Sequence, residues 1–393
     1  MPSLLWTDLY KLTMLQIFYF NEPKDTIAKY RFKCRNVEVT PKGSLLPYKE
    51  EIDKRLTALC GVKFTPKQIE YLATLPFFWS VFIIFLKGFQ LDRKYLHIDE
   101  SSGQLDIWAE GPLLQVMMWE IYVLQITHEV YSLNNYDKAN IVRGDKNLTN
   151  KIQLINDYAK DNEFKFADFG ARRALTADWH RHVVERLQNE ISPDVFIGTS
   201  NLELAMDLDL TSIGTFAHEF PCYYQGIVHP LDSQKAALNA WGDLYKDKLM
   251  IALSDTLGLN KFLEDFNKDL ANKYLSVRHD SGDPYMFTGR MLDHYKTFGI
   301  DPTTKTIVFS DGLDIPKAIA LNDYCKGKIG CSFGIGTSLT NDCGVYALQN
   351  VMKLVAVNGR PVAKISDSTG KCMCEDEDYL KYLRKAIEIF VDM

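Results

Sequence analysis

A histidine beside a carboxylate is the first candidate for chemistry in this chain. His218 and Glu219 lie in the segment GTFAHEF, directly after a short apolar run. A neighbouring carboxylate can orient an imidazole or stabilise its charged form, which suits a nucleophile or an acid–base catalyst. The alternative is a structural or merely exposed histidine, but its place after an apolar run favours catalysis.

A second segment gathers a cation, acids and a hydroxyl in one turn. The sequence RHDSGD begins at Arg278 and includes Asp280 and Ser281. Arginine forms paired hydrogen bonds with phosphate or carboxylate groups, and carboxylates bind ribose hydroxyls or the water shell of Mg2+. The turn favours a sugar phosphate with a divalent ion. The alternative is a capped loop with an internal salt bridge.

Two turns rich in glycine and hydroxyl residues follow later apolar runs. They are SDG, from Ser310 to Gly312, and GIGTS, which contains Gly336 and Thr337. Small residues let a phosphate approach backbone N–H groups, as in the phosphate site after the last strands of many barrels. The chain contains neither GxxxxGK[ST] nor GxGxxG, so it is neither a P-loop nor a Rossmann protein.

Phe169 stands next to two arginines, Arg172 and Arg173, in the segment FGARR. An aromatic ring and guanidinium groups together can hold a flat ring with an acidic substituent. The alternative places Phe169 in the core and the arginines at the start of a solvated helix. The N-terminal segment TDLYKLTM, which contains Tyr10, has a similar alternative as a capped amphipathic helix. The residues alone leave both questions open.

Seven apolar runs position these candidates. Each run ends abruptly in glycine, hydroxyl or charged residues, and a helix-like segment usually fills the interval before the next. The pattern predicts an α/β barrel of parallel strands, whose C-terminal ends converge on one face where ligands bind. The predicted strand regions are Phe164–Arg173, Val195–Asn201, Thr211–Glu219, Leu249–Thr256, Leu275–Asp283, Thr306–Asp314 and Ser332–Thr340.

Strand-like alternation precedes and follows the barrel region. Ala28–Asn36 and Tyr95–Ala109 are expected to form antiparallel strands, and Val351–Ile365 to form a hairpin that turns at Asn358-Gly359. Helical spacing in Leu113–Tyr131 predicts a linking helix. We therefore expect an N-terminal α+β domain over 1–135, a barrel carrying the active site over 136–345, and a C-terminal segment, 346–393, that packs back on the first domain.

Composition limits the classes of function. The formal net charge of -6 disfavours a nucleic-acid surface, so an anionic substrate must meet a local basic pocket. The N-terminus lacks the features of a signal peptide, and the most hydrophobic stretch, Leu75–Leu86, is too short to span a bilayer. We expect a cytoplasmic protein with no membrane or nucleic-acid partner. Its eight cysteines are expected to be reduced thiols.

These segments together resemble the nicotinate phosphoribosyltransferase family over almost the whole chain. The motifs, in the order that the family uses, are TDLYKLTM, YRFKCRN, EGPLLQVMMWEI, DFGARRA, GTSNLELA, GTFAHEF, SVRHDSGDP, FSDGLD and GIGTSLTND. The resemblance implies a type II phosphoribosyltransferase fold. This fold is an irregular α/β barrel with an N-terminal α+β domain that the C-terminal tail completes.

The resemblance also implies a reaction. The family joins nicotinate to phosphoribosyl pyrophosphate, which gives nicotinate mononucleotide and pyrophosphate in the first step of NAD salvage from nicotinate. ATP phosphorylates a histidine that matches His218, and Glu219 would help orient the ring. Hydrolysis of the phosphohistidine to release phosphate, after loss of ADP, drives turnover. Mg2+ and positioning carry most of the ribosyl transfer.

Substrate-binding roles carry over by position. The nicotinate ring would stack between Phe169 and Tyr10, the latter from a second subunit, which implies a homodimer with a shared active site. Ser200 stands where nicotinamide-using relatives are expected to carry an aspartate, and Asp280 would bind ribose hydroxyls or Mg2+ through water. The other residues expected to bind the carboxylate, the phosphates or other parts of the substrates are Arg172, Thr215, Arg278, Ser281, Ser310, Gly312, Gly336 and Thr337.

Other functions remain as alternatives. One is a phosphoribosyltransferase on the same fold that uses nicotinamide or quinolinate, or that is uncoupled from ATP. Ser200 argues against the first of these and His218 against the second. The other is a barrel that only binds phosphorylated sugars, for which the phosphate-binding turns would suffice.

Overall fold

The computed structural model describes residues 3–40, 43–365 and 374–391. The chain divides into two compact units, which differ in extent from the three predicted segments. The first unit contains residues 1–25, 29–214 and 335–353, and the second contains 26–28, 215–334 and 354–393. Residues 136–214, expected in the barrel domain, thus group with the N-terminal region.

Helices make up much of both units. In the first unit they are α1 (Leu9–Asn21), α2 (Lys49–Leu59), α3 (Pro66–Thr74), α4 (Ser80–Gly88), α5 (Leu113–Val116), α6 (Trp119–Leu133), α7 (Lys138–Ala159), α8 (Ala177–Glu190), α9 (Leu202–Asp207) and α16 (Thr337–Thr340). In the second they are α10 (Glu219–Gln225), α11 (Ser233–Tyr245), α12 (Leu259–Asp265), α13 (Lys268–Lys273), α14 (Pro284–Thr297), α15 (Ile315–Cys325) and α17 (Glu377–Val391).

The first sheet contains the predicted antiparallel strands. Its order is β11-β10-β1-β3-β2, and its strands are β1 (Ile27–Cys34), β2 (Leu96–Asp99), β3 (Asp106–Pro112), β10 (Asn350–Val357) and β11 (Arg360–Pro361). The predicted hairpin at Asn358-Gly359 is confirmed, because both residues have positive φ angles and Val357 pairs with Arg360. The strands expected before the barrel are confirmed as well.

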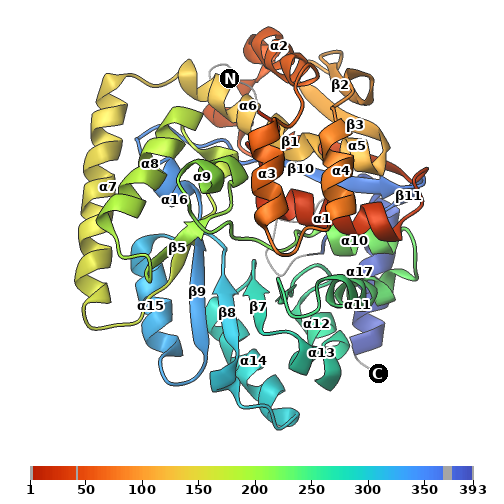
Figure 1. Cartoon of the computed structure of the whole chain (residues 1–393). Coiled ribbons are helices and arrows are strands. Elements are labelled where there is room, and N and C mark those ends of the chain that lie inside the picture. The colour runs from red at the N-terminus through yellow and green to blue at the C-terminus, as the bar shows by residue number, and fades with distance from the viewer. Residues whose placement is uncertain (1–2, 41–42, 366–373, 392–393) are drawn as a thin grey trace. The chain divides into compact units, whose positions relative to one another are not determined.

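The second sheet is parallel and contains most of the strands predicted for the barrel. Its order is β5-β4-β9-β8-β7-β6, and its strands are β4 (Phe166–Asp168), β5 (Phe196–Thr199), β6 (Ile251–Leu253), β7 (Ser276–His279), β8 (Thr306–Phe309) and β9 (Gly330–Ile335). Figure 1 shows β7, β8 and β9 as neighbouring arrows. Six of the seven predicted regions contain strands. Within the described residues, β5 and β6 stand at the two ends of this strand order, and no ladder between them closes the sheet, so the closed barrel stays a prediction.

The predicted strand over Thr211–Glu219 is wrong, and the backbone explains why. Only one parallel bridge forms, between Thr199 and Ser212, with the Ile213 N–H donating to the Thr199 carbonyl at 2.9 Å. Gly214 then takes a φ of 151°, and the following residues lead into α10 instead of extending the pairing. A strand signal from apolar residues is therefore cut short by a glycine with a conformation that other residues avoid.

Gly198 is required where this segment approaches β5. Its φ is 140°, and a Cβ atom there would lie 2.1 Å from the Thr211 carbonyl oxygen. We expect Gly198→Ala to lower the free energy of unfolding by roughly 3 kcal/mol or more, because backbone strain and a backbone clash add together. Urea unfolding of this variant should be compared with Gly103→Ala, where φ is 78° but nothing lies within 4 Å. Equal losses in both variants would contradict the clash.

The helix predicted over Leu113–Tyr131 is confirmed as two helices, α5 and α6, with a break at Met117 and Met118. The next helix, α7, begins at Lys138, because Asp137 and Asn140 form a capping box. The hydrophobic stretch Leu75–Leu86 contributes to α4. Among the described residues, no helix combines the length and apolar character needed to cross a membrane.

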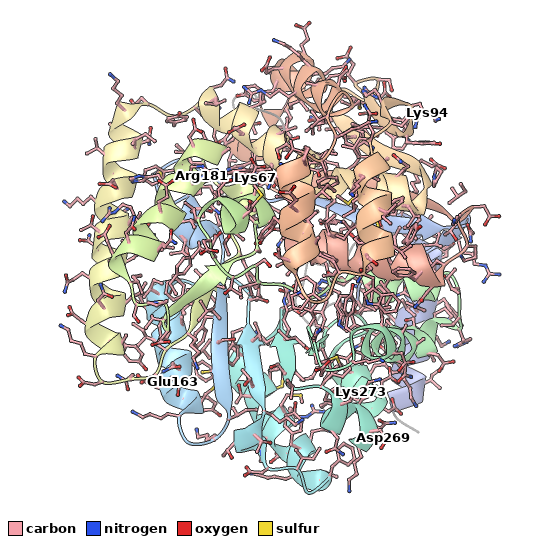
Figure 2. All side chains as sticks on the ribbon, in the orientation of Figure 1. Lys67, Lys94, Glu163, Arg181, Asp269 and Lys273 are labelled. Carbon is pink, nitrogen blue, oxygen red and sulfur yellow. The ribbon has the colours of Figure 1, made fainter. Side chains whose placement is uncertain are left out.

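Several charged side chains on the surface form ion pairs with a residue of the same unit. In the first unit, Lys67 and Arg181 both approach Asp207, at 3.4 and 2.7 Å, and in the second Lys273 lies 2.9 Å from Asp243 (Figure 2).

The seven cysteines within the described residues are free thiols, as expected; Cys372 lies outside those residues.

Candidate active site

His218 lies against a buried aspartate in the second unit. The imidazole belongs to the residue just before α10, and Asp255 follows two residues after the end of β6. His218 Nε2 is 2.6 Å from Asp255 Oδ1, and the Asp255 side chain is only 2% exposed. The end of a parallel strand thus delivers a carboxylate to the imidazole, as expected for strand ends that carry function.

Asp255 is itself held by two further groups. Lys364 Nζ lies 2.7 Å from Asp255 Oδ2, and the Ser281 hydroxyl donates to the same oxygen. The Lys364 side chain is 4% exposed, so its charge is almost fully removed from water. A buried cation needs a partner to offset its desolvation, and Asp255 provides it. The result is a chain of contacts from Lys364 through Asp255 to His218.

Asp280 joins this cluster from the end of β7. Its Oδ1 accepts hydrogen bonds from Arg278 Nη2 at 2.9 Å and from the Ser310 hydroxyl at 2.8 Å. Arg278 Nε also donates to Ser310 Oγ, at 2.7 Å. Asp280 Oδ2 lies 3.7 Å from His218 Nε2. Three predicted residues, Arg278, Asp280 and Ser310, are therefore brought together beside His218.

Burial and the charge of Lys364 keep His218 neutral. Burial and the positive charge of Lys364 lower the pKa of His218 from its ordinary 6.5 to about 4. Burial alone would favour protonated Asp255, but the neighbouring cationic groups hold the pKa of that carboxyl well below its usual range. Lys364 Nζ, 2.7 Å from Asp255 Oδ2, is the cationic neighbour of Asp255 when His218 is neutral.

An ionised Asp255 fixes the tautomer of the imidazole. The carboxylate can only accept, so His218 must carry its proton on Nε2 and leave the lone pair on Nδ1. Within the described residues, Nδ1 makes no hydrogen bond to the protein. The histidine side chain is 16% exposed, which leaves it accessible to a reactant. The arrangement is a neutral nucleophile oriented by an aspartate.

The charge of Lys364 should be visible in a pH profile. The neutral imidazole persists down to about pH 4, so the predicted phosphorylation of His218 should lose rate only near that pH. Lys364→Met removes a cation that opposes imidazolium, so the pKa of His218 and the acidic limb of the rate should move upward. Single-turnover phosphorylation between pH 4 and 8 would measure this shift. An unchanged limb would mean that Lys364 does not set the charge of His218.

The same pKa shift has a consequence for stability. Unfolded His218 binds a proton near its ordinary pKa of 6.5, whereas the folded form does so only near pH 4. The unfolded state therefore holds more protons between these values, and the contribution of His218 to stability falls as pH decreases through this window.

The cluster also has the donors of a cation site. The nearest ligand atoms of His218, Asp255 and Asp280 all lie within 4.8 Å of one another. Carboxylate oxygens suit Mg2+, which usually retains several of its waters. Both carboxylates have protein partners, but the Asp280 side chain is 21% exposed and that of Asp255 only 2%, so Asp280 fits the predicted role of a magnesium contact through water better.

The remaining predicted residues of the second unit lie close in sequence to these groups. Glu219 is buried as the first residue of α10, and Thr215 is buried on the approach to it. The carboxylate bonded to His218 is nevertheless Asp255, and the orienting role of Glu219 stays a prediction. Gly312 has a φ of 56° in the turn after β8, where a glycine is favoured.

In the first unit, Ser200 contacts the N-terminal motif. Its hydroxyl donates to Asp8 Oδ1 at 2.7 Å, and its carbonyl accepts from the Leu9 N–H at 2.8 Å. Burial raises the pKa of Asp8, while the charge of Arg172 acts against that rise. Tyr10, near the start of α1, is 9% exposed. The motif TDLYKLTM thus meets the loop GTSN within one chain; the contribution of Tyr10 to a partner subunit stays a prediction.

Phe169 and Gly336 lie close together. The Phe169 N–H donates to the Ile335 carbonyl at 2.9 Å, and a Cβ on Gly336 would lie 3.1 Å from the Phe169 carbonyl oxygen. Thr337 follows as the first residue of the short helix α16. The glycine therefore permits a close approach between the two predicted binding turns.

Sequence reasoning missed three of the charged groups described above. Asp255 lies at the end of the predicted strand region LMIALSDT, and this strand-end position is a sequence signal that could identify it. Lys364 lies in a strand-like tail, and Asp8 in a motif that also fits a capped helix. Nothing in their local sequence distinguishes them from solvated charges.

The comparisons with known proteins agree with this geometry. The nicotinate phosphoribosyltransferase (NAPRTase) family model matches residues 164–389, and the N-terminal domain model of that family matches residues 5–128. A nicotinate phosphoribosyltransferase of Acinetobacter baumannii is 44% identical over 98% of this chain and 97% of its own length. One of Chromobacterium violaceum is 42% identical over 98% and 97%.

Solved structures show the same likeness. The crystal structure of nicotinate phosphoribosyltransferase from Vibrio cholerae matches with a TM-score of 0.91 and 34% identity, over 98% of this chain and 94% of that chain. The enzyme from Porphyromonas gingivalis matches with a TM-score of 0.91 and 30% identity, over 99% and 100%. With both family models and these full-length likenesses in agreement, the chain belongs to the nicotinate phosphoribosyltransferase family.

Proposed function

We propose that the chain couples the synthesis of nicotinate mononucleotide to ATP through a phosphohistidine at His218. The substrates are nicotinate, phosphoribosyl pyrophosphate and ATP; the products are the mononucleotide, pyrophosphate, ADP and phosphate. The observation that carries the proposal is the 2.6 Å contact between His218 Nε2 and the buried Asp255. It supports a neutral imidazole whose second nitrogen is a nucleophile.

His218 and Asp255 are sufficient for each bond change in the proposed phosphoryl transfer. Nδ1 of His218 attacks the γ-phosphorus of ATP, a nitrogen–phosphorus bond forms, and the bond to the β–γ bridging oxygen breaks as ADP leaves. Asp255 stabilises the positive charge that the ring then carries, while keeping its proton on Nε2. Water later attacks the phosphorus, the nitrogen–phosphorus bond breaks, and the neutral imidazole returns with release of phosphate.

The ribosyl transfer needs positioning more than side-chain chemistry. The pyridine nitrogen of nicotinate forms a bond to C1 of the ribose as the bond from C1 to the pyrophosphate oxygen breaks. Asp280 would bind ribose hydroxyls and, through water, Mg2+. Arg278, Ser310 and Gly312 would bind phosphate oxygens or the carboxylate, with Ser281 and Thr215 beside them. A magnesium ion, when bound, supplies charge neutralisation for the departing pyrophosphate.

Residues of the first unit are proposed to recognise nicotinate and phosphate. Phe169 would stack on the ring, Arg172 would bind an anionic group, and Gly336 with Thr337 would offer backbone N–H groups. Because Ser200 donates its proton to Asp8, its oxygen rather than its proton would face another partner. We also propose that Tyr10 of a second subunit completes the ring site, which requires a homodimer, and that the enzyme acts in cytoplasmic NAD salvage.

Four reactions test the proposal. Phosphoribosyl pyrophosphate and Mg2+ are incubated with nicotinate or nicotinamide, each with and without ATP, and mononucleotide, ADP and phosphate are measured. We expect product with nicotinate, stimulated by ATP and accompanied by ADP and phosphate. A nicotinamide product would favour the alternative substrate, and a rate independent of ATP would contradict coupling. Binding of phosphoribosyl pyrophosphate without any product would favour the non-catalytic alternative.

A further inference from the structure

Asp168 is a buried carboxylate that joins three segments of the first unit. It is the last residue of β4, and its side chain is fully buried. Its Oδ1 accepts a hydrogen bond from the Gly170 N–H at 2.8 Å, and its Oδ2 accepts one from the Thr199 hydroxyl at 2.6 Å. His180 Nε2 also lies 2.7 Å from Oδ2. Both oxygens are therefore used, and the carboxylate cannot rotate without breaking hydrogen bonds in the protein interior.

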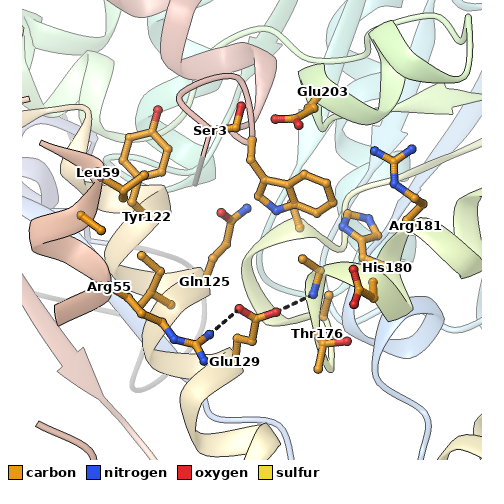
Figure 3. A pocket seen from close by; sticks show the side chains of 17 residues that line it. Ser3, Arg55, Leu59, Tyr122, Gln125, Glu129, Thr176, His180, Arg181 and Glu203 are labelled. Atoms are coloured by element: carbon orange, nitrogen blue, oxygen red, sulfur yellow. Dashed lines mark hydrogen bonds and ion pairs between the residues drawn. The ribbon is translucent and has the colours of Figure 1, made fainter. Parts of the chain in front are cut away.

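The third segment is helix α8, from which His180 reaches the carboxylate. Figure 3 shows the imidazole among the side chains that line a cavity of the first unit, and the His180 side chain is fully buried. Burial alone would raise the pKa of Asp168, but the contacts with His180 and Thr199 hold that pKa below its usual range. An ionised carboxylate only accepts hydrogen bonds, so the ring donates through its Nε2–H. Asp168 is thus an ionised group held in the interior by its donors.

Two of the segments that Asp168 joins carry residues proposed to recognise substrate. The turn after β4 carries Phe169, the proposed stacking residue, and the turn after β5 carries Ser200. The Ser200 N–H donates to the Asp168 carbonyl at 2.8 Å. Thr199 Oγ1, which donates to the Asp168 side chain, also accepts from the Asn201 N–H at 3.1 Å. The carbonyl and the side chain of one residue therefore both set the separation of the two turns.

Strand pairing alone gives this separation little support. β4 and β5 are parallel, with Asp168 opposite Thr199, but the register shifts between Phe166 and Asp168. Such a shift interrupts the evenly spaced hydrogen bonds of a parallel pair. β5 also stands at one end of the strand order of this sheet. The Asp168 carboxylate supplies additional hydrogen bonds at the point where the ladder is irregular.

We propose that Asp168 is a positioning residue for nicotinate, which holds Phe169 and Ser200 at the spacing that the substrate requires. The inference rests on the proposed function, which places both residues at the nicotinate site. Because its side chain is fully buried, Asp168 acts through these two residues and does not touch the substrate. Loss of its contacts should therefore weaken nicotinate binding and leave the phosphorylation of His218, which uses groups of the second unit, unchanged.

Thr199→Val and Asp168→Asn test the proposal in the full-length protein. Thr199→Val has a similar volume but removes the hydroxyl that links Asp168 to the turn of Ser200, and Asp168→Asn removes the charge and one accepting oxygen. Each variant should raise the KM for nicotinate about tenfold or more, whereas kcat and the phosphorylation of His218 by ATP should change by less than about twofold. Thr199→Ser retains the hydroxyl and should restore most of the wild-type KM. Calorimetry with nicotinate alone should follow the same order of affinities.

The control for a general loss of packing is Thr40→Val. Thr40 is buried in the same unit, and its hydroxyl donates to the Val37 carbonyl at 2.6 Å. This variant should be destabilised in urea to a similar degree as Thr199→Val but should keep the wild-type KM for nicotinate. A similar rise of KM in Thr40→Val would show that any loss of a buried hydroxyl weakens the site, and the specific role of Asp168 would be overturned.

The wild type in the same assays separates this inference from the proposed function. If the wild type formed no mononucleotide under any of the conditions above, the proposed reaction would be wrong and the positioning role would be lost with it. If the wild type made the mononucleotide and both Thr199→Val and Asp168→Asn kept its nicotinate KM, the reaction would stand. Only the positioning role of Asp168 would then be overturned, and its contacts would serve stability alone.

Discussion

Replacing His218 by alanine is expected to abolish the stimulation of mononucleotide synthesis by ATP, together with ADP release. A slow synthesis that does not need ATP should remain at high substrate concentrations, because the ribosyl transfer itself requires no side-chain nucleophile. The distinctive result is that ATP no longer stimulates synthesis, while the ribosyl transfer itself still occurs. The measurement is the initial rate with nicotinate, with and without ATP, and the ratio of ADP to mononucleotide formed.

The matched control for this variant is His229→Ala. His229 is exposed, lies in the same unit, and its side chain caps no helix. It should behave as the wild type in rate and in ADP release. Acid-labile phosphate from γ-labelled ATP should appear on the wild type and on His229→Ala but not on His218→Ala. Full ATP stimulation in His218→Ala would remove His218 from the mechanism.

The sequence predicted the strand ends of the site better than the closure of the fold. Arg278, Asp280 and Ser310 lie at the ends of two neighbouring parallel strands, β7 and β8, as the sequence predicts, and hydrogen bonds join them. Hydrophobic periodicity and the residues at strand ends are local features of the sequence, so both can be recognised without knowledge of the tertiary structure. Closure of a barrel depends on pairing between edge strands, and the segment expected to help close it contains Gly214 with its unusual φ angle.

The partners of the predicted residues were harder to foresee. His218 has a carboxylate next to it in sequence, yet the carboxylate that contacts it is Asp255, which is 37 positions away along the chain. Lys364 comes from a hairpin tail more than a hundred residues farther along the chain. Such contacts are set by how the loops after different strands meet, and a single sequence carries little information on which loops do so.

Asp255→Asn is expected to slow phosphorylation of His218 by a factor of roughly 100 to 10,000, as for other histidines that lose an orienting carboxylate. The asparagine amide can no longer fix the Nε2 tautomer or stabilise the charged ring. The variant should also lose up to about 3 to 5 kcal/mol of stability, since the buried Lys364 loses its 2.7 Å contact with a carboxylate while Asp280 remains 3.9 Å away. The readouts are single-turnover phosphorylation by γ-labelled ATP and urea unfolding.

The double variant Asp255→Asn with Lys364→Met separates these two losses. Removing the charge of Lys364 should restore most of the stability lost in Asp255→Asn. A methionine of similar length needs no counter-ion at this site, where the lysine side chain is 4% exposed. Phosphorylation should stay slow, because the imidazole still lacks its carboxylate. If restored stability brought phosphorylation back to the wild-type rate, Asp255 would act only by holding Lys364. If both the stability and the phosphorylation rate stayed low, the loss of activity would come from a disturbed folded structure and not from the missing carboxylate of Asp255.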